Sequence, residues 1–123
     1  MGGVDRRGFG DEAEGAAVRH LEARGYAVRD RNYLCRQGEL DIVAEQGELL
    51  CFVEVRMRST AAWGDPSLTV SFAKQRRVVK AALRYLFEHR VRNRAIRFDV
   101  ISVLGRGAAA KVEHIPNAFD AGM

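Results

Sequence analysis

The sequence predicts an α/β protein in which helices pack on a mixed sheet. Two segments favour helix, and the segments between and after them either alternate or are rich in β-branched and aromatic residues. The resulting order is α, β, β, β, α, β, β, with no internal repeat. With 123 residues, 47% of them hydrophobic, the chain is long enough for one core and too short for two. We therefore expect a single domain at residues 11–119, between a flexible N-terminal tail at 1–10 and a short C-terminal tail at 120–123.

The first helix is predicted from Asp11, a residue type that caps helix N-termini, to Arg24. Gly25 follows directly, and glycine is a favourable residue just beyond a helix C-terminus. Residues 1–10 contain four glycines and no apolar periodicity. This composition is typical of a loose terminal segment, so we expect the helix to begin after it.

Three strands are expected next. A short strand at residues 26–29 leads into residues 32–34, and two β-rich runs follow at 38–45 and 48–58. The two runs flank Gln46-Gly47, which predicts a hairpin with these two residues as its turn. The turn determines which residues of the two strands face one another.

The second half of the chain contains one helix and two strands. Residues 59–71 have turn chemistry and no clear period, so a loop is expected. A helix follows at 72–90, with strands at 95–104 and 111–115. The helix carries an apolar stripe at helical spacing, formed by Val78, Val79, Ala82, Leu83 and Leu86.

Composition excludes several classes of protein. No apolar run approaches the roughly 20 residues that a membrane span needs, and the N-terminus has no apolar signal-peptide core. Cys35 and Cys51 have neither a CxxC motif nor a paired histidine, which argues against a disulfide framework or a zinc site. We expect a cytoplasmic protein with reduced thiols, in which Cys51 fills the core.

Positive charge is concentrated in one part of the chain. Residues 74–97 contain nine Lys and Arg and one acid, Glu88, a local charge of +8, whereas the whole chain carries +4. On the predicted helix, Arg77, Lys80 and Arg84 lie on the flank opposite the apolar stripe. A basic surface of this kind suits a polyanion such as nucleic acid, although a solvated helix would have the same composition.

Two acids and one cation are predicted to share a face of the hairpin. If Gln46-Gly47 form the turn, Asp41 faces Phe52, and Asp41 and Glu54 become diagonal neighbours. Arg56 lies two residues beyond Glu54 and points the same way.

Glu14 is a third candidate acid. In the first helix it lies between Val18 and Leu21, within the apolar stripe. A charge in that position is costly unless it is paired or bound to a metal. We therefore expect Glu14 to point at the core or at a cavity against it.

This arrangement has two interpretations. Mg²⁺ and Mn²⁺ prefer oxygen ligands, and a Mg²⁺ site commonly uses one or two carboxylates, which Asp41 and Glu54 supply. Arg56 would then stabilise a phosphate near the metal. The alternative is a cluster of salt bridges among Glu39, Glu54 and Arg56, with Glu14 capped by an arginine.

Several sequence blocks, in the same order, resemble the bacterial YraN family. They are Glu14 in the first helix, GELDIV (38–43), FVEVR (52–56), a GDP loop, KQRR (74–77), RFDVISV (97–103) and VEHIPNAF (112–119). The resemblance extends from about Gly10 to Phe119. This family is predicted to share the restriction-endonuclease-like fold of archaeal Holliday junction resolvases, so the resemblance implies an αβββαβ core.

The resemblance also implies a site. Nucleases of this fold have an acid followed by a spaced Asp or Glu, any residue and Lys, and these positions match Asp41 and the triplet from Glu54 to Arg56, with Glu14 as the helix acid. Arg56 replaces the lysine of the wider group, and arginine cannot act as a base because it keeps its proton at neutral pH.

Two functions follow from the resemblance. One is a Mg²⁺- or Mn²⁺-dependent endonuclease that cuts branched or otherwise structured DNA, with catalytic residues Glu14, Asp41, Glu54 and Arg56. Lys74 and Gln75 at the start of the second helix, with Arg77, Lys80 and Arg84, would then contact the nucleic acid. The other is a nucleic-acid-binding module that keeps the fold without catalysis. Junction resolvases of this fold are dimers, so a homodimer is a further expected partner.

Overall fold

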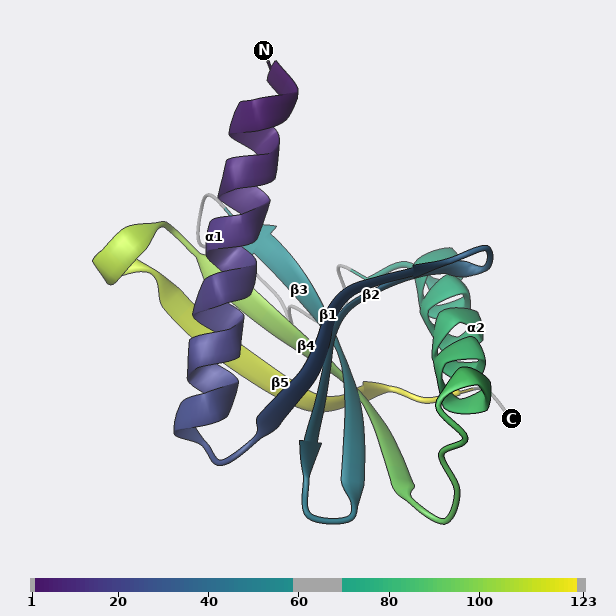
Figure 1. Ribbon diagram of the computed structural model, residues 1–123. Coiled ribbons are helices and arrows are strands. Elements are labelled where there is room, and N and C mark those ends of the chain that lie inside the picture. Colours follow the sequence, from purple (N-terminus) through teal and green to yellow (C-terminus); the bar gives the residue numbers. More distant parts are fainter. Residues whose placement is uncertain (1, 59–69, 122–123) are drawn as a thin grey trace.

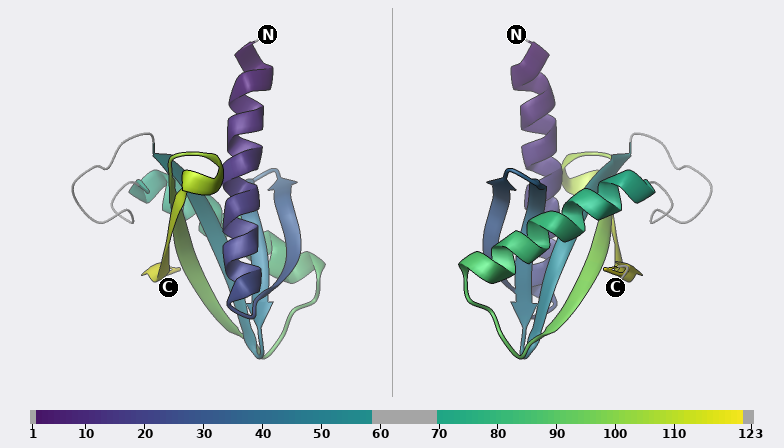
Figure 2. Two further views of the ribbon diagram at one scale, coloured as in Figure 1. Left: turned by 90° about the vertical axis from the view of Figure 1, so that its left-hand side faces the viewer. Right: turned by 90° about the vertical axis from the view of Figure 1, so that its right-hand side faces the viewer.

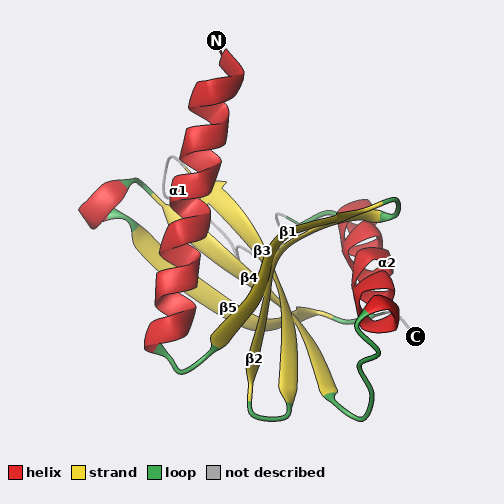
Figure 3. Ribbon diagram, in the orientation of Figure 1, coloured by secondary structure: helices red, strands yellow, loops and turns green. Residues whose placement is uncertain are grey.

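A computed structural model describes residues 2–58 and 70–121 of the chain, with side chains from residue 11 (Figure 1). Most of the expected loop at 59–71 therefore lies outside the described residues. The elements are α1 (Gly2–Ala23), β1 (Ala27–Cys35), β2 (Gly38–Gln46), β3 (Leu49–Arg58), α2 (Phe72–Glu88), β4 (Ala95–Leu104), a 3₁₀ turn (Gly107–Ala109) and β5 (Lys111–Phe119) (Figure 3).

The five strands form one mixed sheet in the order β1-β2-β3-β4-β5. All neighbours are antiparallel except β3 and β4, which run parallel and are connected through α2. The helices α1 and α2 cover opposite faces of the sheet (Figure 2). The predicted α/β class is confirmed, and the succession from α1 to β4 is the αβββαβ core of the restriction-endonuclease-like fold.

Each helix buries its own core against the sheet. On the α1 face, Ala17 and Leu21 pack with Ile42, Cys51, Val53 and Ile101 among others. On the α2 face, the cluster includes Leu50, Phe52, Val78, Tyr85 and Phe98. Complete burial of one such large side chain contributes about 1.5–3 kcal/mol. Cys51 is 0% exposed, which confirms its prediction as a core residue.

The helices differ from the prediction in two details. α1 begins at Gly2 and not at Asp11, so residues 2–10 form its first turns, where the sequence suggested a loose tail. Glycine weakens a helix by only about 1 kcal/mol per residue and does not prevent one. In α2, Leu83 is 46% exposed although it was assigned to the apolar stripe, and Tyr85 is buried in its place.

The hairpin of β2 and β3 has a different register from the predicted one. Ile42 pairs with Val53 and Gln46 with Leu49, so the loop residues are Gly47 and Glu48. Gly47 has φ +58° and occupies the first loop position, where a type II′ turn requires glycine. The error is a shift of two residues, which leaves each side chain on its predicted face.

β2 separates from β3 at the end of this ladder. The pairing extends to Ile42 and Val53, and beyond this point β2 stays with β1, whose turn reaches over α2 (Figure 1). A Cβ on Gly38 would lie 2.9 Å from the carbonyl oxygen of Arg77, so only glycine permits this approach. The divergence of the strands places Asp41 and Glu54 at the opening between them.

Candidate functional site

Asp41 is the first residue of β2 beyond the paired region. Its Oδ2 accepts a hydrogen bond of 2.9 Å from the backbone N–H of Val55. The side chain of Asp41 thus satisfies a β3 donor at the point where the backbone of β2 leaves the sheet. This contact fixes the carboxyl next to Glu54.

Glu54 is almost completely buried, with 2% of its surface exposed. Its Oε1 lies 3.4 Å from Nζ of Lys74, the third residue of α2. Its Oε2 is buried and has no hydrogen-bond partner among the described residues. A buried carboxylate oxygen without a donor is costly, which marks this position as one that requires a further cation, proton or water.

Glu14 reaches the same end of the sheet from α1. Its Oε1 accepts hydrogen bonds from Nε of Arg31 at 3.2 Å and from Nδ2 of Asn32 at 2.9 Å. The arginine cap on Glu14 that the alternative interpretation expected is therefore present. The spacing of residues along the chain does not indicate Arg31 and Asn32 as its partners. Asn32 has φ +54°, a left-handed backbone conformation in which asparagine is enriched. Its residue type could therefore have indicated a special backbone position here.

The three acids have raised pKa values. Burial is the main cause of the increase for Glu14, Asp41 and Glu54, and the nearby charge of Asp41 adds to it for the other two. Lys74 opposes the increase at both Asp41 and Glu54, so its ammonium acts on the whole pair. Burial of the carboxyls, and not an excess of neighbouring negative charge, is thus the main reason why these pKa values are raised.

Arg56 lies on β3, partly buried and aligned with Ser102 of β4. Its positive charge lowers the pKa of Asp41, which places it within electrostatic range of the carboxyl pair. Arg56 follows Glu54 by two residues on β3, and its role in the site stays a prediction. Glu54 forms an ion pair with Lys74, a residue that the alternative cluster of Glu39, Glu54 and Arg56 did not include.

The residues of α2 assigned to nucleic acid are divided between two roles. Lys74 contacts Glu54, and Nε2 of Gln75 donates to the carbonyl of Val70 at 3.0 Å. Arg77, Lys80 and Arg84 are exposed. Nε of Arg84 lies 3.2 Å from Oε2 of Glu88, and Lys80 lines a cavity of about 310 Å³ beside residues 120–121. Lys74 therefore belongs to the carboxylate site, and Gln75 supports the start of α2. The exposed cations farther along α2 form an outer basic surface.

The donor set fits a hard divalent cation held by two carboxylates. No group of three or more His, Cys, Asp or Glu side chains forms a metal-binding cluster within residues 11–58 and 70–121. Mg²⁺ often takes only one or two protein carboxylates and completes its shell with water and phosphate. The unpartnered oxygen of Glu54 and the adjacent Asp41 carboxyl match that requirement.

A second buried acid lies on the other side of β3. Asp99 is 0% exposed and accepts hydrogen bonds from Arg97 (2.8 Å), His114 (2.7 Å) and the backbone N–H of Asn117 (2.9 Å). Nη2 of Arg97 also donates to the hydroxyl of Tyr26 at 2.7 Å. These contacts connect β4, β5 and Tyr26, the residue before β1. They give a structural role to residues of the RFDVISV and VEHIPNAF blocks.

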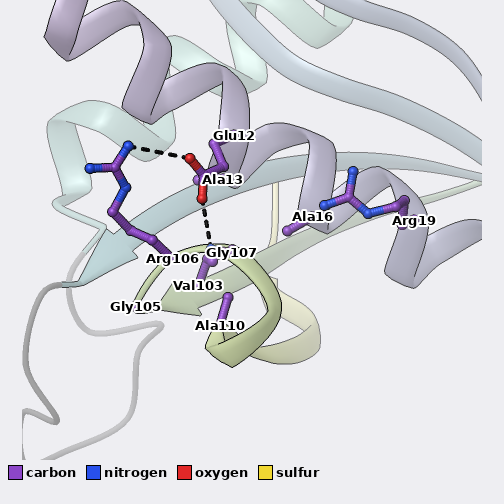
Figure 4. A pocket seen from close by; sticks show the side chains of 9 residues that line it. All are labelled: Glu12, Ala13, Ala16, Arg19, Val103, Gly105, Arg106, Gly107 and Ala110. Carbon is purple, nitrogen blue, oxygen red and sulfur yellow. Dashed lines mark hydrogen bonds and ion pairs between the residues drawn. The ribbon is translucent and has the colours of Figure 1, made fainter.

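A small pocket between α1 and the β4–β5 turn lies apart from the carboxylate site (Figure 4). Glu12 accepts hydrogen bonds there from Nη2 of Arg106 at 3.3 Å and from the backbone N–H of Gly107 at 2.7 Å. These donors lower the pKa of Glu12. The contacts fasten the turn to α1, and they give this acid a structural role.

Neither α1 nor α2, as far as the structure describes the chain, is long and apolar enough to span a membrane.

Comparison with known proteins places the sequence within a defined group. A family model described as "Uncharacterised protein family UPF0102" matches residues 13–103. A UPF0102 protein of Myxococcus xanthus is 71% identical over 120 residues, which is 98% of this chain and 95% of the relative. A UPF0102 protein of Geobacter metallireducens is 44% identical over 117 residues, 95% of this chain and 96% of the relative. None of these descriptions states an activity.

Proposed function

Because the chain belongs to the uncharacterised protein family UPF0102, the YraN family, we propose its function from the chemistry of the carboxylate site. The protein is a metal-dependent DNA endonuclease of the cytoplasm, which hydrolyses phosphodiester bonds in branched or otherwise structured DNA. One observation carries the proposal: Asp41 and Glu54 lie together at the divergence of two strands, and a buried oxygen of Glu54 has no donor among the described residues.

Each residue of the site has a role in this reaction. Asp41 and Glu54 hold the Mg²⁺ or Mn²⁺, Glu14 supports the site from α1, and Arg56 binds the phosphate. The cation, when bound, would neutralise the phosphate and activate the attacking water. The water oxygen would form a bond to phosphorus and release one proton to solvent, while one ester P–O bond breaks and the leaving oxygen acquires a proton from solvent.

The exposed cations of α2 suit the DNA backbone. Arg77, Lys80 and Arg84 are solvent-exposed on the helix whose first turn supplies Lys74 to the site. Binding there would release counterions from DNA, and the affinity would fall as salt rises. The same helix would thus connect substrate binding to the carboxylates.

A non-catalytic nucleic-acid-binding module is the second candidate function. It is favoured by the contacts that the acids already make, Glu54 with Lys74 and Glu14 with Arg31. In this alternative the acids are structural, and the basic surface of α2 binds the nucleic acid. The homodimer expected from the resemblance remains a prediction under both functions.

Cleavage assays on linear, nicked, flapped and branched DNA, with Mn²⁺ and with chelator, test the proposal. We expect Mn²⁺-dependent cleavage of at least one branched substrate, and its loss in Glu54→Gln while DNA affinity changes less than about twofold. Glu113→Gln on β5, an exposed strand glutamate, is the matched control and should cleave normally. DNA binding without cleavage of any substrate would contradict the nuclease and support the binding module.

A further inference from the structure

Lys74 has a fixed position in the fold. Ser71 caps α2, and its Oγ accepts a hydrogen bond of 3.1 Å from the backbone N–H of Lys74. The next residue, Gln75, binds the backbone of Ser71 and of Val70 at 2.9 and 3.0 Å. The start of the helix is therefore well anchored. The lysine side chain is the flexible part, and it ends at Glu54.

The ion pair between Lys74 and Glu54 is asymmetric. The side chain of Glu54 is 2% exposed, whereas that of Lys74 is 39% exposed. The ammonium therefore faces the buried acid on one side and solvent on the other. The separation of 3.4 Å is longer than the about 2.7–2.9 Å of a strong charge-assisted hydrogen bond, so the contact is loose.

We propose that Lys74 is the internal cation of the carboxylate site, displaced from Glu54 when a divalent ion binds and then free to contact the phosphate under attack. The inference rests on the proposed function, because it requires that a divalent cation binds at Asp41 and Glu54. It assigns Lys74 to the reacting site, and thus a role distinct from that of the exposed cations on α2. Lysine is suited to this exchange, since its ammonium is a compact charge on a flexible stem.

A divalent ion must compete with the ammonium for the same carboxylate. Removing Lys74 makes the potential at the site more negative, which strengthens the binding of every cation there. A divalent ion responds about twice as strongly as a proton because it carries twice the charge. Metal affinity should therefore rise even though Glu54 also becomes easier to protonate.

The test is Mn²⁺ binding to the full chain without DNA, by titration calorimetry at one fixed pH, together with single-turnover cleavage. We expect Lys74→Met to bind Mn²⁺ about tenfold more tightly than the wild type. Its cleavage rate at saturating Mn²⁺ should fall about 100-fold or more. Lys111→Met, the same change two strands away on β5, should alter neither quantity. Lys74→Gln keeps a donor for Glu54 and should show the same direction if the methionine variant does not fold.

The outcomes separate this inference from the proposed function. If the wild type binds Mn²⁺ and Lys74→Met binds it with unchanged affinity, the inference is wrong and the proposed function stands. Unchanged cleavage by a folded Lys74→Met variant would also overturn it. If the wild type binds no Mn²⁺, the proposed metal site itself fails, and the inference fails with it.

Discussion

Asp41 and Asp99 each satisfy a backbone N–H of a neighbouring strand, but they differ in how many other donors bind them. Each accepts a hydrogen bond of 2.9 Å from a backbone N–H of the neighbouring strand where the regular pairing is interrupted, Asp41 from Val55 and Asp99 from Asn117. Asp99 is further bound by Arg97 and His114, whereas the nearest ammonium to the Asp41 pair makes a loose contact with Glu54.

The pKa values follow from this difference. Burial alone would raise the pKa of Asp99, but the bonds from His114, Arg97 and the Asn117 N–H lower it to about 2. The pKa of Asp41 is raised, because burial is opposed by fewer donors. Both carboxyl oxygens of Asp99 accept hydrogen bonds, whereas Oε2 of Glu54 has no partner among the described residues. Both places hold buried acids, so burial does not distinguish them. The candidate site differs because one of its buried carboxyl oxygens lacks a hydrogen-bond donor among the described residues.

Asp99→Ala should be the most destabilising change. It leaves Arg97 and His114 partly buried without their shared acid, which should reduce the free energy of unfolding by about 3 kcal/mol. Urea denaturation measures this change. Glu12→Ala is the matched control, because Glu12 also accepts bonds from an arginine and a backbone N–H but lies at the surface. Its loss should be clearly smaller, because solvent screens an exposed ion pair, and equal losses would contradict the comparison.

Acid pH should remove the contribution of Asp99. Its folded-state pKa lies below the unfolded value, so the stabilisation is complete above about pH 4 and is lost as the pH falls toward about 2. The expected loss is about 2 kcal/mol. Urea titrations at pH values from about 5 to about 2.5 should show wild type and Asp99→Asn converging. A constant difference between them across this range would show that Asp99 does not titrate as predicted.

Glu54→Gln should have the opposite and smallest effect on stability. With chelator present, removing this buried charge should raise the free energy of unfolding by about 1 kcal/mol, since buried ion pairs contribute little net stability. Because the pKa of Glu54 is raised, the charged form destabilises the fold, and the gain should grow as the pH rises from about 5 to about 8. Thermal unfolding of Glu54→Gln beside Glu113→Gln measures it. A destabilised Glu54→Gln would mean that the acid serves the fold.

The sequence predicted the arrangement of the site better than its contacts. Alternation placed Asp41 and Glu54 on one face, and this held because a register error of two residues preserves the face. The helical period likewise placed Glu14 toward the interior, where it is 8% exposed. These predictions depend only on local spacing.

The contacts that were missed depend on long-range packing. Helix α2 connects the parallel strands β3 and β4 and packs across one face of the sheet, which brings Lys74 to Glu54. No local sequence pattern specifies this packing. Likewise Asp99 collects donors from β4 and β5, and Tyr26 joins through Arg97. The sequence blocks contain Lys74, Asp99 and the donors on β4 and β5 without indicating that they converge, and Tyr26 lies outside the blocks.

The hydrogen bond from Val55 to Asp41 gives the site an intrinsic spectroscopic reporter. Its donor is a backbone amide beyond the last β2–β3 pair, so the protection of this one proton from exchange with solvent depends on a side chain and not on the sheet ladder. Protonation of Asp41 or its engagement by a cation would weaken the bond. The chemical shift and exchange rate of the Val55 amide in NMR spectra should therefore report protonation of Asp41 or cation binding to it, and no substrate is needed.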